Sequence, residues 1–267
     1  MIKYSYADVK KTLTKVGLKK GQTIFLCPEI YKFGEINNVN NKVDYFKIFL
    51  GIILKMVGRN GTVVMNTYTF NTLRYNEKFI YEKTNVTSGK IAEYFLKMKG
   101  VVRSNHPAFS VAAIGKFKKK ICSNNSLNNY GLGSPYSNFS KLNGKVLNLG
   151  QNFYLNPFLH LAEFNAGVSY CYNKFTNIIY QKNKKIVKKY FSSFVRYKHL
   201  DVKYDFKKLK KALIKKKIIN QESLGSGKIY LYGVNDFCKI VNEGLKKDQN
   251  YLLKVQPEYN KNKFPAA

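Results

Sequence analysis

The 267-residue chain is poor in the side chains that metal sites and disulfide frameworks use. It has three histidines and four cysteines, and the cysteines are Cys27, Cys122, Cys171 and Cys238. No two of these cysteines stand at the spacing of a C-x-x-C pair. Because structural zinc sites usually take closely spaced Cys or His ligands, the sequence predicts no metal site. We expect the thiols to be small buried side chains.

Long apolar segments are also missing. The longest apolar run covers residues 48–54, and a lysine flanks it on either side. Because a bilayer crossing needs about 20 apolar residues, the sequence predicts no membrane span. The first residues contain no apolar stretch of signal-peptide length, so we expect a cytoplasmic protein. The 45% hydrophobic content is sufficient for a substantial core.

Acidic residues are scarce: 15 stand against 47 basic residues, which gives a formal charge of +32. Only four of the basic residues are arginines, namely Arg59, Arg74, Arg103 and Arg196. Proteins that recognise phosphates and base edges usually rely on the arginine fork, whereas these lysines are spread along the chain. We therefore expect no nucleic-acid partner. The positive field favours anionic small ligands and disfavours polycations.

Helix and strand signals alternate along the chain, which is typical of an α/β fold. Ser5 and Asp8 have the spacing of a capping box, and Ser88 is expected to cap a later helix. We expect helices near 5–16, 43–57, 88–97, 205–216 and 235–246, and strands at 23–27, 62–66, 109–115, 145–150 and 228–234. The pattern predicts a layered α/β/α sandwich with a central mixed sheet. No boundary divides it, so we expect one domain over 1–267, with the C-terminal third as a peripheral acceptor-binding lobe.

One segment, NPFLHLAEFNAG (156–167), carries a chemically useful pair. Asn156 is a good helix cap, and Pro157 fits the first helical position. The helix then places His160 and Glu163 three residues apart on one face. A carboxylate beside an imidazole orients the ring and raises its basicity, as the removal of a proton from an attacking amine requires. Taken alone, such a pair is more often a surface or core contact than a catalytic one.

A second segment, VVRSNHPAFSVAAIG (101–115), places polar residues directly before an apolar strand. These residues are Arg103, Ser104 and His106, and a GSPY turn follows at 133–136. Open α/β sheets bind ligands at such strand ends, where backbone N–H groups and hydroxyls gather. Taken alone, this segment is a turn that enters a strand.

The order of these segments, together with GTVVMNTYTF (61–70), GLGSPYSNFSKLNGKVLNLG (131–150) and FVRY (194–197), covers nearly the whole chain. The chain resembles the aminoglycoside 3-N-acetyltransferase family in this order. The resemblance implies transfer of an acetyl group from acetyl-CoA to an amino group on a sugar ring. It implies His160 as the general base, Glu163 as its partner and a role for His106 in shaping the cleft. The expected coenzyme-binding residues are Arg103, Ser104, Ser110, Val111 and Tyr31.

Two positions depart from the family pattern. The first loop of the family usually carries a His-Ser-Ser run, and here the residues are Cys27, Pro28 and Glu29. This change puts hydroxyl contacts from that loop to the coenzyme in doubt. Cys27 is a candidate acyl-accepting nucleophile only if a base lies near it. The residues at 156–158 also differ, and their more apolar character fits a different acceptor.

The predicted mechanism is direct transfer in a ternary complex, with backbone N–H groups at strand ends stabilising the oxyanion. The positive field favours an anionic acceptor, such as a nucleotide-linked amino sugar used in surface-glycan biosynthesis, over a polycationic aminoglycoside. An aminoglycoside acceptor stays open, as does a homodimer. A third alternative is a non-catalytic basic protein that binds nucleic acid or anionic surfaces, and its binding would fall steeply with salt.

Overall fold

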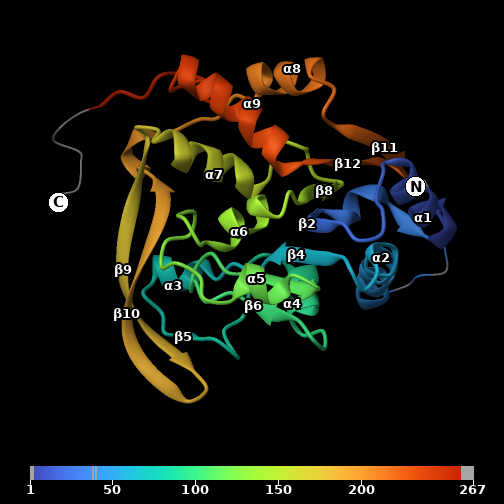
Figure 1. The fold of residues 1–267 in the computed structure, drawn as a ribbon, viewed down its shortest axis with the longest axis horizontal. Helices are drawn as coiled ribbons and strands as arrows, with labels where there is room; N and C mark the ends of the chain where they lie inside the picture. Colours follow the sequence, from blue (N-terminus) through green and yellow to red (C-terminus); the bar gives the residue numbers. More distant parts are fainter. Residues whose placement is uncertain (1–2, 38, 40, 260–267) are drawn as a thin grey trace.

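The computed structural model describes residues 3–37, 39 and 41–259 and is built around a seven-stranded sheet (Figure 1). The strand order is β11-β12-β8-β2-β4-β7-β6. The three central strands β8, β2 and β4 are parallel, and the remaining neighbours pair antiparallel. The strands are β2 (Thr23–Pro28), β4 (Thr62–Asn66), β6 (Val102–Arg103), β7 (Val111–Gly115), β8 (Lys145–Leu149), β11 (Asn220–Leu224) and β12 (Gly227–Gly233).

The central strands are buried on both faces, and their alternating side chains feed two separate hydrophobic cores. Along β2, Ile24 and Leu26 belong to one core, and Phe25 belongs to the other. The first core is covered by α1 (Tyr6–Lys15), α2 (Lys42–Val57) and α4 (Lys90–Leu96). The second is covered by α5 (Lys118–Cys122), α6 (Pro135–Lys141), α7 (Pro157–Ala166), α8 (Lys207–Lys215) and α9 (Val234–Lys247). The predicted α/β/α sandwich with a mixed sheet is confirmed.

The helix termini confirm one predicted cap and correct another. At α1 the Ser5 side chain accepts from the Asp8 N–H and Asp8 bonds back, which is the expected capping box. The prediction that Ser88 caps α4 is wrong, because Gly89 is the N-cap residue. Gly89 has φ of 99°, a conformation that suits glycine, and the turn directs Ser88 away from the helix. The Ser88 hydroxyl instead accepts from the backbone N–H of Tyr68 at 2.6 Å.

A long hairpin, which the sequence did not predict, forms a second sheet along one side of the molecule (Figure 1). It consists of β9 (Cys171–Lys182) and β10 (Lys185–Arg196), and β5 (Phe79–Ile80) pairs parallel with β9. A small core between the hairpin and β5 contains Phe79, Ile178, Tyr180 and Phe191. Lysines interrupt the apolar alternation of both strands, so period-two patterning does not identify the hairpin.

The remaining elements are short. They are β1 (Lys3–Tyr4), β3 (Glu35–Ile36), α3 (Phe70–Arg74) and two turns of 3-10 helix, η1 (Ile30–Phe33) and η2 (Lys198–Leu200). Strands β1 and β3 pair parallel beside η1. Within the part of the chain that is described, no helix has the length and apolar character needed to cross a bilayer.

Candidate active site

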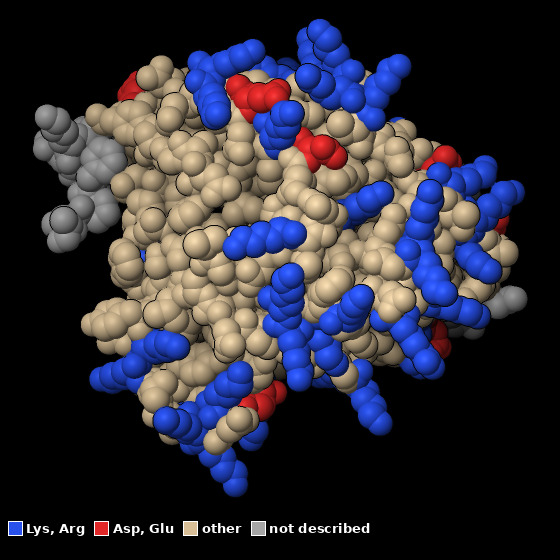
Figure 2. Space-filling view, in the orientation of Figure 1, with Lys and Arg blue, Asp and Glu red and all other residues tan. Residues whose placement is uncertain are grey.

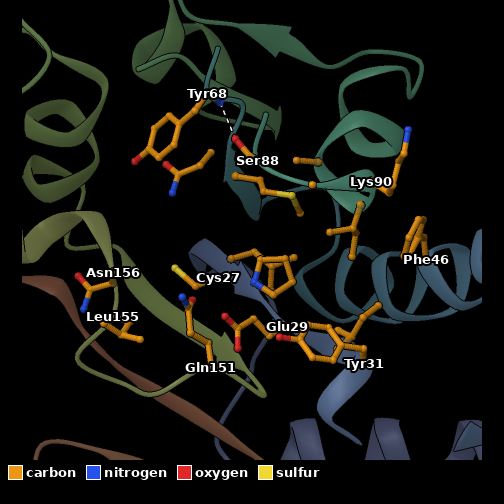
Figure 3. Close-up of a pocket in the computed structure, with 18 of the residues that line it drawn as sticks. Cys27, Glu29, Tyr31, Phe46, Tyr68, Ser88, Lys90, Gln151, Leu155 and Asn156 are labelled. Carbon is orange, nitrogen blue, oxygen red and sulfur yellow. Dashed lines mark hydrogen bonds between the residues drawn. The ribbon is translucent and has the colours of Figure 1, made fainter. Parts of the chain in front are cut away.

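A pocket with a volume of about 1250 Å³ lies at one edge of the central sheet. The three parallel strands all end there, so the pocket receives Cys27 and Pro28 from β2, Asn66 from β4 and Gln151 after β8 (Figure 3). This edge is where open α/β sheets bind ligands. One wall comes from α2 and the start of α4, and the opposite wall comes from α7 and the segment that follows β10.

His160 lies on the α7 wall of this pocket. The helix begins as predicted: the Asn156 side chain accepts from the Phe158 N–H, and Pro157 occupies the first turn. One turn further, Nδ1 of His160 lies 2.6 Å from Oε2 of Glu163, and 41% of the His160 side chain is exposed. The predicted contact between these two side chains is therefore confirmed. In the neutral ring, Nδ1 donates to the carboxylate and Nε2 carries the lone pair.

Glu163 is fully buried and is held by two tyrosines as well as by His160. Its Oε1 accepts from the hydroxyl groups of Tyr170 and Tyr204, each at 2.8 Å. Burial, and next the charge of Glu163, raise the pKa of both phenols far above the ordinary value, so both hydroxyls remain donors. Three donors thus compensate the carboxylate for its lost hydration. The arrangement fixes the ring of His160 against a rigid acceptor.

The other histidine of interest, His106, lies outside the pocket lining and is buried. Its Nδ1 accepts from the backbone N–H groups of Ala108 and Phe109 at 3.2 and 3.1 Å. Nε2 therefore carries the proton and donates to the Ser192 carbonyl at 3.1 Å. Burial lowers the pKa of His106 to about 4, so the ring is neutral near pH 7. Both nitrogens are occupied, and the ring connects the loop before β7 to β10.

Four of the expected coenzyme-binding residues, Arg103, Ser104, Ser110 and Val111, are also buried and apart from the pocket lining. Nε of Arg103 donates to the Ser110 hydroxyl at 3.0 Å, and its terminal nitrogens donate to backbone carbonyls. The Ser104 hydroxyl accepts from the Val111 N–H at 2.9 Å. These polar groups hold β6 and β7 to the neighbouring loops.

The fifth expected coenzyme-binding residue, Tyr31, does line the pocket, and 73% of it is exposed. It follows the end of β2, where Cys27, Pro28 and Glu29 occupy the positions of the family's first loop (Figure 3). In that loop burial raises the pKa of the Cys27 thiol to about 12, and Pro28 has no N–H. The Glu29 N–H donates to the Leu149 carbonyl at 2.7 Å, and its carboxylate pairs with Lys32. The loop therefore offers neither a hydroxyl group nor a thiolate.

Three pocket residues that matter to the site were not singled out from the sequence. Arg196, at the end of β10, places its guanidinium 5.3 Å from the ring centroid of Tyr204. Tyr204 stacks on Phe206, and all three line the pocket. Of the three, only Arg196 lies in a segment that carries the family resemblance, FVRY (194–197). Tyr204 lies in a polar segment between η2 and α8, where no local pattern indicates a role.

Comparison with known proteins agrees with this geometry. Residues 32–246 match the model of the family described as aminoglycoside 3-N-acetyltransferase. A relative from Bacillus subtilis (strain 168), the SPbeta prophage-derived aminoglycoside N(3')-acetyltransferase-like protein YokD, is 28% identical over 68% of this chain and 73% of its own.

Solved structures share the fold. AAC-IIIb in a binary complex with CoASH has a TM-score of 0.76 at 17% identity, covering 96% of this chain and 100% of the other. A mutant of AAC(3)-IVa in complex with a gentamicin has a TM-score of 0.77 at 21% identity, covering 94% and 92%. Since the family model spans most of the sequence, the chain belongs to the aminoglycoside 3-N-acetyltransferase family and is an N-acetyltransferase.

Proposed function

We propose that this protein acetylates an amino group of a small amino sugar, with His160 as the general base. The observation that carries the proposal is the pair formed by His160 and Glu163, in which Nδ1 is bonded and the ring remains partly exposed in the pocket at the sheet edge. A base must lie within hydrogen-bond reach of the proton it removes, and Nε2 is the only ring nitrogen left for that contact.

The chemistry follows from the state of the ring. Nε2 of His160 takes a proton from the acceptor nitrogen as that nitrogen bonds to the thioester carbonyl carbon. The bond from this carbon to sulfur then breaks, and the proton passes from Nε2 to the departing sulfur, which yields an amide and free CoA. The buried carboxylate of Glu163 stabilises the imidazolium that forms in between.

The two walls of the pocket differ in the charge and polarity of their side chains, and we use this difference to assign a substrate to each. Lys42 and Lys90 stand at the starts of α2 and α4, beside the apolar side chains of Val39, Phe46 and Ile91. This wall suits the phosphates and the apolar arm of the coenzyme, and Tyr31 closes it (Figure 3). We assign the coenzyme to this wall, and we assign Arg103, Ser104, Ser110 and Val111 a structural role.

The acceptor then occupies the wall formed by His160, Tyr204 and Phe206. Among the described residues that line this wall, the charged side chain is the guanidinium of Arg196, because Glu163 is buried and bonded to His160, Tyr170 and Tyr204. Arginine is well suited to bind a carboxylate or phosphate. We therefore favour an anionic acceptor such as a nucleotide-linked amino sugar. A polycationic aminoglycoside is the second candidate, since Glu29 and Glu35 also line the pocket and the family takes its name from such acceptors.

Release of the CoA thiol from acetyl-CoA tests both parts of the proposal, with nucleotide-linked amino sugars and aminoglycosides as two separate panels. His160→Ala should lower turnover by about 10²–10⁴-fold, the usual contribution of a general base. His199→Ala, outside the pocket lining, is the matched control. Turnover that survives His160→Ala refutes the assignment of the base.

The same assay with Arg196→Gln decides the acceptor class. Loss of the guanidinium should raise KM for nucleotide-linked amino sugars and leave, or improve, any turnover of aminoglycosides. If aminoglycosides are the better substrates of the unchanged protein, the anionic acceptor is rejected while the role of His160 stands.

A further inference from the structure

The outer face of the β9–β10 hairpin carries a row of large apolar side chains exposed to solvent. In an antiparallel ladder, two residues that pair directly lie on the same face of the sheet. Alternate pairs along the hairpin therefore share the outer face. They are Gln181 with Ile186, Ile179 with Lys188, and Asn177 with Tyr190. Phe175 continues the row. The exposed fractions are 71% for Phe175, 43% for Ile179, 56% for Ile186 and 63% for Tyr190.

Part of the opposite face of the hairpin packs against β5, while Val187 on that face is 36% exposed. Ile178, Tyr180 and Phe191 pack with Phe79 of β5 in the small core. Nearer the base of the hairpin, the backbone of Ser192 bonds to Leu127 and Asn129. The outer face is therefore held rigidly, and the described part of the chain leaves these four apolar side chains exposed.

The charged side chains of the hairpin itself are of one sign. Residues 171–200 contain no aspartate or glutamate. The strands and their turn carry Lys174, Lys182, Lys184, Lys185, Lys188 and Lys189. Glu82 lies at the turn, where it accepts from the Asn183 N–H at 2.9 Å. Figure 2 shows lysines gathered at the lower left, around the free end of the hairpin. By the register, Lys188 shares the outer face with the apolar row, while Lys182 and Lys189 lie on the opposite face. Exposed apolar side chains with lysines nearby are typical of surfaces that bind anionic lipids.

We propose that the outer face of the β9–β10 hairpin binds the surface of a membrane rich in anionic lipids. The aliphatic Ile179 and Ile186 favour acyl chains over nucleic acid, which would be recognised by stacking on aromatic side chains. A second copy of this chain is disfavoured, because its own hairpin would bring the same lysines against these. The binding is peripheral and involves no spanning segment. It requires no acetyl transfer and therefore stands apart from the proposed function.

A single fluorophore tests the contact, since the chain contains no tryptophan. Tyr190→Trp places an indole in the row. The matched control is Ile214→Trp on α8, where the side chain is 58% exposed among lysines but belongs to no such row. With vesicles of phosphatidylglycerol and phosphatidylcholine, we expect a blue shift of emission for Tyr190→Trp only. Vesicles of phosphatidylcholine alone should give no shift.

Cosedimentation of the unlabelled protein with the same vesicles separates the apolar and charged contributions. Replacing Phe175, Ile179, Ile186 and Tyr190 by serine should lower the partition coefficient at least about tenfold. Lys188→Gln, on the outer face, should lower it about fivefold. Equal emission shifts at positions 190 and 214, or vesicle binding unchanged by the serine substitutions, would overturn the proposal. Either result would show that the basic protein is attracted to anionic vesicles without using this face. A shift caused by RNA or by self-association, in the absence of a shift with vesicles, would overturn it as well.

Discussion

Tyr204 and Glu163 are 41 residues apart in the sequence, and the hydroxyl of Tyr204 donates to Oε1 of Glu163 at 2.8 Å. Tyr204 also lines the pocket and lies beneath the guanidinium of Arg196. Tyr204 thus forms part of the wall assigned to the acceptor, and it also holds Glu163, the partner of the proposed base. The segment after β10 is in this way connected to the His160 pair.

The connection predicts a kinetic effect for Tyr204→Phe. A hydrogen bond to a charged group contributes roughly 1.5–3 kcal/mol, so we expect kcat to fall about tenfold or more while KM for acetyl-CoA is unchanged. Tyr170→Phe is the matched control, because it removes the other donor to Oε1 from a residue outside the pocket lining. Similar losses in both variants place the effect on Glu163. A loss confined to Tyr204→Phe would mean that Tyr204 acts on the acceptor instead.

Replacing Arg103 separates a structural role from coenzyme binding. Its guanidinium donates to the carbonyls of Thr67 and Thr84 and to Ser110. Arg103→Met removes these donors from a largely buried network. We expect the free energy of unfolding to fall by about 3–5 kcal/mol, as is usual when a buried charged network is broken. Urea denaturation measures this loss. If instead stability is retained and KM for acetyl-CoA rises, Arg103 contacts the coenzyme.

The buried neutral His106 predicts that stability falls in acid. Its pKa is about 4 in the folded protein and 6.5 ordinarily, so the unfolded chain takes up the proton first as pH decreases. Stability is therefore lost progressively below about pH 6.5, and the loss from this residue between pH 7 and pH 5 is about 2 kcal/mol. His106→Gln should show a shallower dependence on pH in urea denaturation at the two values. An equally steep dependence in that variant would assign the acid sensitivity to other groups.

Cys27 lies at the pocket, but its thiol is protonated. Because burial raises the pKa to about 12, thiolate is scarce at pH 8, and we expect slow modification by iodoacetamide. Cys27→Ala should retain turnover within a few fold, since direct transfer needs no acyl-enzyme. An acetylated Cys27 trapped by rapid quenching, followed by inactivity of the alanine variant, would replace direct transfer by a two-step route.

The sequence predicted the parts of the molecule that depend on local patterns. Continuous apolar runs identified β2 and β4, since strands buried on both faces show no alternation. The capping signal at Asn156 set the start of α7, and helical spacing brought His160 to Glu163. All of these inferences use residues fewer than ten positions apart.

What the sequence did not reveal depends on contacts between distant segments. His106 was expected to help shape the cleft, and its neighbours looked available to ligands because the loop before β7 is polar. Their hydrogen bonds to Ser192, Thr67 and Thr84 arise only when β10 and the segments after β4 and β5 fold against that loop. Tyr204 was missed for the same reason, since its role appears only beside Glu163.

Among the described residues, the buried charged side chains are Glu163 and Arg103, and each is compensated mainly by neutral groups. Tyrosine hydroxyls and an imidazole surround the first, and backbone carbonyls, a serine and an aromatic ring surround the second. Neither depends on a counterion at the surface. The interior is thus electrically independent of the lysine-rich exterior. The number of surface lysines can therefore change without removing a hydrogen-bond partner from Glu163 or Arg103.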